Sequence, residues 1–149
     1  MSKMLVIGVG NIFRGDDGVG LVVARRVREA APPDVVVLEQ SGEGAALMEA
    51  WREAEFVILV DAVSSGAEPG TIHHFAAHQQ TIPARFFHYS THAFSVAEAV
   101  EMARALGSLP PRLLLYGIEG KSFAAGQELS PEIAQAAEVV TAQILALFA

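Results

Sequence analysis

The residues best suited to chemistry are carboxylates and one histidine that stand where apolar segments end or helices begin. Asp16 and Asp17 follow a glycine-rich stretch, Asp61 and Glu119 follow apolar runs, and His92 precedes an expected helix. Two carboxylates with one imidazole form a borderline-hard donor set. Such a set suits nickel, zinc or iron and leaves positions open for other ligands.

The acidic residues also have structural interpretations. An Asp just before a helix commonly caps it and complements the positive end of the helix dipole, so one of Asp16 and Asp17 is expected to be a cap. The other is then available for a site. Asp61 directly follows five apolar residues, and an ionised carboxylate there needs a partner to offset its desolvation. That partner is either a metal ion or a set of loop amides.

Most of the five histidines are expected to be structural. His74 and His78 are four residues apart, as are His88 and His92, a spacing that aligns metal ligands only on a helix, and neither stretch has a helical pattern. His73 and His74 fall in a short strand and are expected to be partly exposed. His92 is the exception, because a loop before a helix can carry it over the same strand ends as Asp61.

The elements that must position these residues alternate between apolar strands and amphipathic helices. Strands are expected at 4–8, 34–39, 56–60, 71–75 and 112–118, and helices at about 17–30, 43–53, 95–107 and from 131 onward. The third helix is capped by Ser95 or, one turn earlier, by Ser90 or Thr91, and residues 76–91 are expected to form a loop. This alternation is typical of an α/β fold with a largely parallel sheet, in which 71–75 can lie at an edge. Ligands of such sheets gather at the carboxyl ends of the strands.

Composition narrows the class of protein. The 149 residues, 52% of them hydrophobic, predict one domain over 1–149. The formal charge of -7 disfavours nucleic acid and anionic membranes as partners. Since there are no cysteines, any metal must be held by His, Asp or Glu. The apolar start is interpreted as a strand rather than a signal peptide, and no segment has the roughly 18–20 apolar residues of a membrane span. The expected location is the cytoplasm.

Four sequence blocks, in order along the whole chain, carry a family resemblance. They are GVGNIFRGDDGVG at 8–20, LVDAV at 59–63, STHAF at 90–94 and LLYGIEG at 114–120. With these blocks the sequence resembles the hydrogenase maturation endopeptidases, which trim the C-terminal tail from the large subunit of nickel-iron hydrogenases. The first block is the most specific.

The resemblance implies both a fold and a site. The implied fold is a three-layer sandwich, a twisted five-strand sheet with helices on both faces. The implied metal-binding and catalytic residues are Asp17, Asp61 and His92. The resemblance further implies that the nickel arrives with the large-subunit precursor, that the trio engages it there, and that a nearby peptide bond is cleaved.

A dinucleotide-binding α/β module is the main alternative. Gly8 and Gly10 follow a strand and open toward a helix, and Glu39 ends the second strand where a ribose-binding acid would lie. Against this, Phe13 occupies the place of the third glycine, and the acidic pair brings negative charge beside the pyrophosphate. No nicotinamide or flavin is therefore expected.

A second alternative is a partner-binding domain without enzymatic activity. In it, Phe86, Phe87 and Tyr89 would form an exposed apolar patch. The same patch could also help an enzyme to hold a protein substrate.

Overall fold

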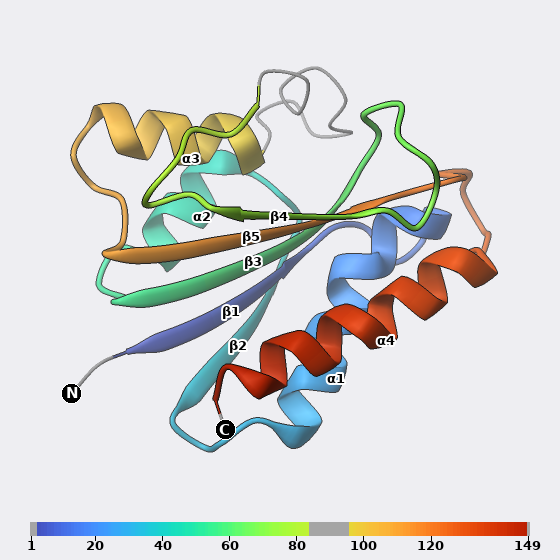
Figure 1. Cartoon of the computed structure of the whole chain (residues 1–149), viewed down its shortest axis with the longest axis horizontal. Helices are drawn as coiled ribbons and strands as arrows, with labels where there is room; N and C mark the ends of the chain where they lie inside the picture. The colour runs from blue at the N-terminus through green and yellow to red at the C-terminus, as the bar shows by residue number, and fades with distance from the viewer. Residues whose placement is uncertain (1–2, 84–95, 149) are drawn as a thin grey trace.

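A five-stranded sheet forms the centre of the computed structural model, which describes residues 3–83 and 96–148 (Figure 1). The strand order is β2-β1-β3-β5-β4. Four strands are parallel, β1 (Met4–Val9), β2 (Val35–Gln40), β3 (Phe56–Val63) and β5 (Arg112–Glu119), and β4 (Ile72–Ala76) pairs antiparallel with β5 at the edge. The predicted α/β class, the mostly parallel sheet and the edge position of 71–75 are confirmed.

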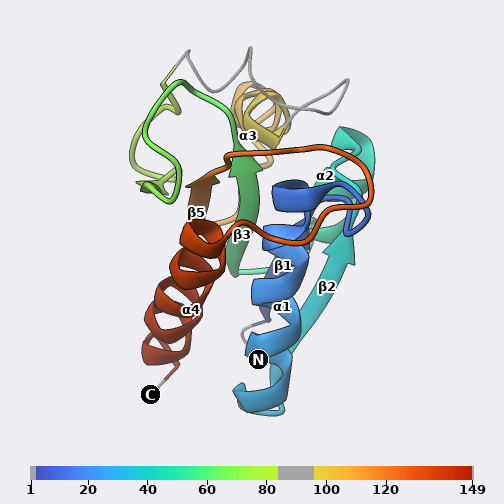
Figure 2. The same cartoon turned by 90° about the vertical axis from the view of Figure 1, so that its right-hand side faces the viewer.

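Helices cover both faces of this sheet. Figure 1 shows α1 (Val19–Ala30) and α4 (Pro131–Ala146) on one face and α2 (Gly44–Ala50) and α3 (Val96–Ala105) on the other. Figure 2 shows α1 and α4 side by side, and the two helices are in contact. The predicted three-layer sandwich is confirmed. No helix in the described ranges is long and apolar enough to cross a membrane.

The two faces of the sheet bury separate apolar clusters, because successive strand residues point to opposite faces. In β1, Leu5 and Ile7 pack with the α2–α3 layer, whereas Val6 packs with the α1–α4 layer. Leu47 and Trp51 fill the first cluster and are 0% and 1% exposed, as expected for the inward face of that helix. Strands buried on both faces explain the continuous apolar runs in the sequence.

Two glycines allow α1 to lie very close to the sheet. A Cβ on Gly20 would fall 2.4 Å from the carbonyl oxygens of both Val9 and Val60, and one on Gly8 would fall 2.3 Å from the carbonyl oxygen of Gly20. These are backbone atoms of the sheet and of the helix itself, so they have little freedom to move aside. The N-terminal end of α1, with the residues just before it, is therefore held against the carboxyl ends of β1 and β3.

Several element boundaries differ from the predictions by one to three residues, most clearly in the following three elements. A short 3-10 helix, η1 (Gly15–Gly18), precedes α1, so the α-helix starts at Val19 rather than near residue 17. β3 runs to Val63 rather than ending before Asp61, because its ladder with β5 continues through Asp61 opposite Gly117. α2 ends at Ala50 rather than at residue 53. The caps proposed for the third helix lie outside the described residues.

Candidate active site

Asp17 is positioned by the loop that leaves β1. The backbone N–H of Asn11 donates to the Asp17 carbonyl oxygen at 3.2 Å and to its carboxylate Oδ2 at 3.1 Å. Gly10 makes this approach possible, since it has a φ of 148° and a Cβ there would lie 1.9 Å from the Asp17 carbonyl oxygen. Asp17 is 2% exposed. A buried carboxylate thus stands in a defined orientation at the end of β1.

Asp61 lies near the carboxyl end of the neighbouring strand β3, where it is 4% exposed. Parallel pairing of β1 with β3 aligns Gly8 with Val60, the residue just before Asp61. The 3-10 helix that carries Asp17 contacts β3. The fold therefore brings Asp17 and Asp61 to the same end of two adjacent strands, as expected for a site at the strand ends.

The third residue of the predicted trio, His92, lies outside the described residues, as do His88 and the proposed aromatic patch of Phe86, Phe87 and Tyr89. Within 3–83 and 96–148, no group of three or more His, Asp or Glu side chains is placed to hold a metal ion. Convergence of the full trio on one ion stays a prediction.

Asp16 is fully buried and is not a helix cap. The N-cap of α1 is Gly18, with no side-chain capping bond. The Asp16 carboxylate instead accepts four hydrogen bonds from the segment between β5 and α4, from the N–H groups of Lys121, Ser122 and Ser130 and from the Ser130 hydroxyl, at 2.7–2.9 Å. The expectation of a capping Asp is wrong, because the 3-10 helix turns this side chain toward another loop.

Several hydrogen bonds join the segment 121–130 to the loop after β1. Besides the Asp16 contacts, Gly126 N–H donates to the Phe13 carbonyl oxygen at 2.9 Å, and the Arg14 guanidinium Nε donates to the Phe123 carbonyl oxygen at 3.4 Å. Figure 2 shows this segment crossing from β5 over η1 before it returns to α4. A distant part of the chain therefore holds the loop that carries Asp17.

Glu119, at the end of β5, belongs to a buried polar cluster with Ser65 and His73. Its carboxylate accepts from the Ser65 N–H and hydroxyl and lies 3.1 Å from His73 Nε2. The His73 side chain is only 9% exposed, less than expected for an edge strand. This cluster attaches the connection between β3 and β4 to the end of β5.

Two further histidines have structural contacts, as expected. His78 Nδ1 accepts a hydrogen bond of 3.1 Å from the Leu113 N–H at the start of β5. The His74 ring stacks on Tyr116 with 4.3 Å between ring centres. Partial burial lowers the pKa of His74 and raises that of Tyr116.

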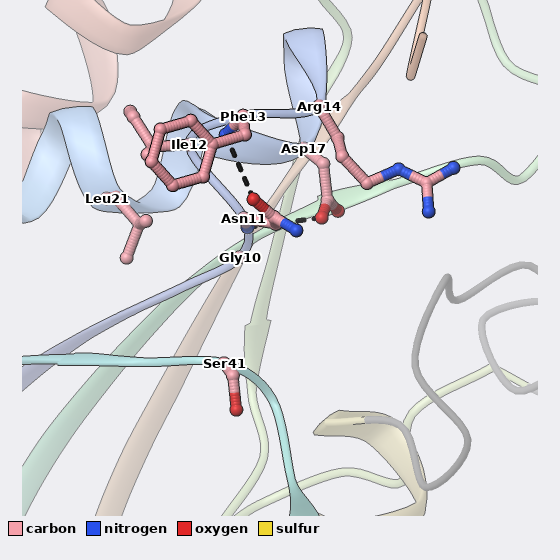
Figure 3. Close-up of a pocket in the computed structure, with 8 residues that line it drawn as sticks. All are labelled: Gly10, Asn11, Ile12, Phe13, Arg14, Asp17, Leu21 and Ser41. Atoms are coloured by element: carbon pink, nitrogen blue, oxygen red, sulfur yellow. Dashed lines mark hydrogen bonds between the residues drawn. The ribbon is translucent and has the colours of Figure 1, made fainter. Parts of the chain in front are cut away.

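A pocket of about 470 Å³ opens beside Asp17 (Figure 3). It is lined by residues from the loop after β1, from η1 and α1, and by Ser41 just after β2, namely Gly10, Asn11, Ile12, Phe13, Arg14, Asp17, Leu21 and Ser41. Although Asp17 is almost fully buried, it forms part of this wall. A group bound in the pocket would therefore lie next to Asp17.

Groups that the dinucleotide-binding alternative would involve form hydrogen bonds within the protein. The Asn11 N–H, directly after Gly10, donates to Asp17. Glu39, the candidate ribose ligand, accepts from Arg25 and Arg28 at 2.9–3.1 Å, and the Arg25 hydrogen bond lowers the pKa of Glu39. Both groups are engaged with the protein itself.

Comparison with known proteins identifies the family. A family model described as "Hydrogenase maturation protease" matches residues 21–147. The chain belongs to the hydrogenase maturation protease family. The resemblance seen in the sequence blocks is thereby confirmed.

The match to this chain covers different shares of the length of its relatives. The hydrogenase 2 maturation protease of Escherichia coli is 30% identical over 148 residues, 97% of this chain and 89% of that protein. HupD proteins of Rhodobacter capsulatus and Bradyrhizobium diazoefficiens are 30% and 31% identical over 79% of this chain, but the match spans only 57% and 62% of their length. The chain thus spans less than two thirds of these HupD proteins.

Solved structures agree with the fold of this hydrogenase maturation protease family member. The endopeptidase HybD of Escherichia coli superposes with a TM-score of 0.82 at 26% identity, over 99% of this chain and 91% of that one. HycI of Thermococcus kodakarensis gives 0.73 at 26% identity, over 99% and 92%.

Two functional features of the site were missed from the sequence. Asn11 belongs to the sequence block 8–20 and was given no role there, yet its N–H orients Asp17 and its side-chain oxygen accepts the Phe13 N–H at 2.9 Å. An Asn after glycines is a signal for such a turn. The link from Asp16 to Ser130 joins residues 114 apart, and no local pattern indicates it.

Proposed function

We propose that this chain is an endopeptidase that removes the C-terminal peptide from the large-subunit precursor of a nickel-iron hydrogenase. In this proposal Asp17, Asp61 and His92 recognise nickel that the precursor already carries. The observation that carries it is the placement of two carboxylates, 2% and 4% exposed, at the ends of adjacent strands in a member of this family.

The chemistry of the donor set supports the proposal. Carboxylate oxygens and an imidazole nitrogen make an incomplete ligand set for nickel, which leaves positions for ligands from the precursor. A metal ion shared between two proteins can polarise a carbonyl group or a water molecule. The contribution of the chain is to hold Asp17 through Asn11 and Asp61 through the β3–β5 ladder, so that a bound precursor meets prearranged ligands.

The partner in this proposal is a protein, and the location is the cytoplasm. The names of two relatives support the substrate class, since these proteins match nearly the whole chain and are called a hydrogenase maturation protease and a hydrogenase maturating endopeptidase. Nucleic acid and dinucleotides have no part in it. The internal use of Glu39, the candidate ribose ligand, supports the exclusion of a dinucleotide.

Cleavage of a purified precursor, with and without nickel, tests the proposal. The wild-type protein is expected to shorten the nickel-loaded precursor without added metal and to leave the nickel-free precursor intact. Asp17→Asn, Asp61→Asn and His92→Ala are each expected to lower cleavage by at least about 100-fold, because losing even an outer partner of a metal ligand typically costs about 10–100-fold. Asp34→Asn, an exposed Asp before β2, is the matched control and is expected to keep full activity.

Two results would contradict the proposal. Efficient cleavage of nickel-free precursor would rule out recognition of substrate-borne nickel. Full activity of Asp61→Asn and His92→Ala would show that the site lies on other residues. Circular dichroism of each variant separates loss of function from loss of fold.

A further inference from the structure

Phe13 is the most exposed large apolar side chain in the described part of the chain, at 77%. Its backbone is nevertheless held on both sides. The Phe13 N–H donates to Asn11 Oδ1 at 2.9 Å, and the Phe13 carbonyl oxygen accepts from Gly126 at 2.9 Å. The ring is thus presented to solvent by an ordered loop. A single exposed ring is common on protein surfaces, whereas a ring grouped with other apolar side chains is typical of a binding surface.

The ring stands at a pocket whose other apolar walls are Ile12 and Leu21. With about 470 Å³, the pocket falls within the size range of sites that bind small groups or short peptide segments. Figure 3 shows that the apolar side chains and Asp17 surround the same pocket. Apolar contact and the proposed metal ligand are therefore available to one bound segment.

Because Asp17 lines the same pocket as the apolar side chains, it limits which molecule can bind there. If Asp17 meets nickel carried by the precursor, the group in the adjoining pocket must belong to the stretch of precursor next to that nickel. We propose that the pocket formed by Ile12, Phe13 and Leu21 binds an apolar side chain of the precursor beside the bond that is cleaved. This inference rests on the proposed function and adds a specificity-determining residue, Phe13.

A coupling experiment between enzyme and precursor tests the inference. Phe13→Ala is expected to raise KM for the nickel-loaded precursor about tenfold or more, on the scale of losing contact with a large apolar group, with a smaller change in kcat. Phe13→Leu, which keeps an apolar side chain, is expected to restore most of the loss. Leu106→Ala, which removes a 69% exposed side chain on the far side of the sheet layer, is the control and is expected to leave KM unchanged.

The precursor side of the experiment identifies the occupant. Each apolar residue flanking the cleaved bond is replaced in turn by Ser, and the variants are offered to the wild type and to Phe13→Ala. At one position, the replacement by Ser is expected to lower kcat/KM about tenfold for the wild type but less than about threefold for Phe13→Ala. Such a difference indicates that Phe13 and this precursor residue contact each other.

Three outcomes would overturn the inference. In the first, Phe13→Ala has a KM within twofold of the wild type. In the second, every precursor variant affects both enzymes equally. In the third, Phe13→Ala changes the oligomeric state on size-exclusion chromatography, which would assign the ring to contact with a second copy. If one of these outcomes is observed and Asp17→Asn is inactive in the same assay, the pocket assignment fails while the proposed function stands. If the wild type cleaves no precursor, both fail.

Discussion

Replacing Asp16 by Asn tests how strongly the segment 121–130 is attached to the loop that carries Asp17. One carboxylate oxygen, Oδ2, accepts from Lys121 N–H, Ser122 N–H and the Ser130 hydroxyl, and the other, Oδ1, accepts from Ser130 N–H. Every partner is a donor. An amide has only one oxygen, so in either orientation its NH2 group must face a backbone N–H.

The expected loss of stability follows from the better of these two orientations. With the amide oxygen in place of Oδ2, the Ser130 N–H and the new NH2 group both lose their partners. Each buried donor without a partner costs about 1–3 kcal/mol, so the variant should lose roughly 3 kcal/mol. No discount for solvent applies, because Asp16 is 0% exposed. For a domain of this size the loss lowers Tm by about 6–12 °C.

Thermal and urea unfolding followed by circular dichroism measure this effect. Asp34→Asn makes the same chemical change at an exposed position and should stay within about 0.5 kcal/mol of the wild type. Ser130→Ala removes only the hydroxyl bond to Asp16 and should lose roughly 1.5 kcal/mol. If Asp16→Asn unfolds together with Asp34→Asn, the four bonds do not contribute as described and the reasoning is wrong.

Two further predictions concern packing and titration. Gly20→Ala should destabilise the protein by roughly 3 kcal/mol or more, since the new Cβ would lie 2.4 Å from two sheet carbonyl oxygens, whereas Gly107→Ala, with open space and a φ of 70°, should lose only about 1–2 kcal/mol in urea unfolding. NMR titration of His74 should give a pKa below 6.5, because partial burial disfavours the charged ring. As the folded state then binds fewer protons than the unfolded one, the contribution of His74 is fully present above pH 6.5 and declines as the pH falls toward the folded pKa. A His74 pKa above 6.5, or equal stabilities of the two glycine variants, would contradict these expectations.

The prediction of the layers succeeded because the signals are local. Continuous apolar runs at 4–8 and 56–60 indicate strands covered on both faces, and helical spacing between them indicates crossover helices. Pro131 at the first turn of α4 was correctly recognised as a helix start. Element ends were less accurate, because the length of β3 depends on how far its partner β5 continues.

The sequence by itself determined the fold class, the family and the end of the sheet at which Asp17 and Asp61 lie, because strand ends and short motifs are properties of neighbouring residues. The family resemblance implied Asp17 for the site, but no local pattern gave Asp16 a role other than that of a helix cap. Only the tertiary structure decided the role of Asp16, by directing it to Lys121, Ser122 and Ser130, while Asp17 lines a pocket. The physical reason is that a buried carboxylate takes its role from the donors that surround it, and for Asp16 those donors come from more than 100 residues along the chain.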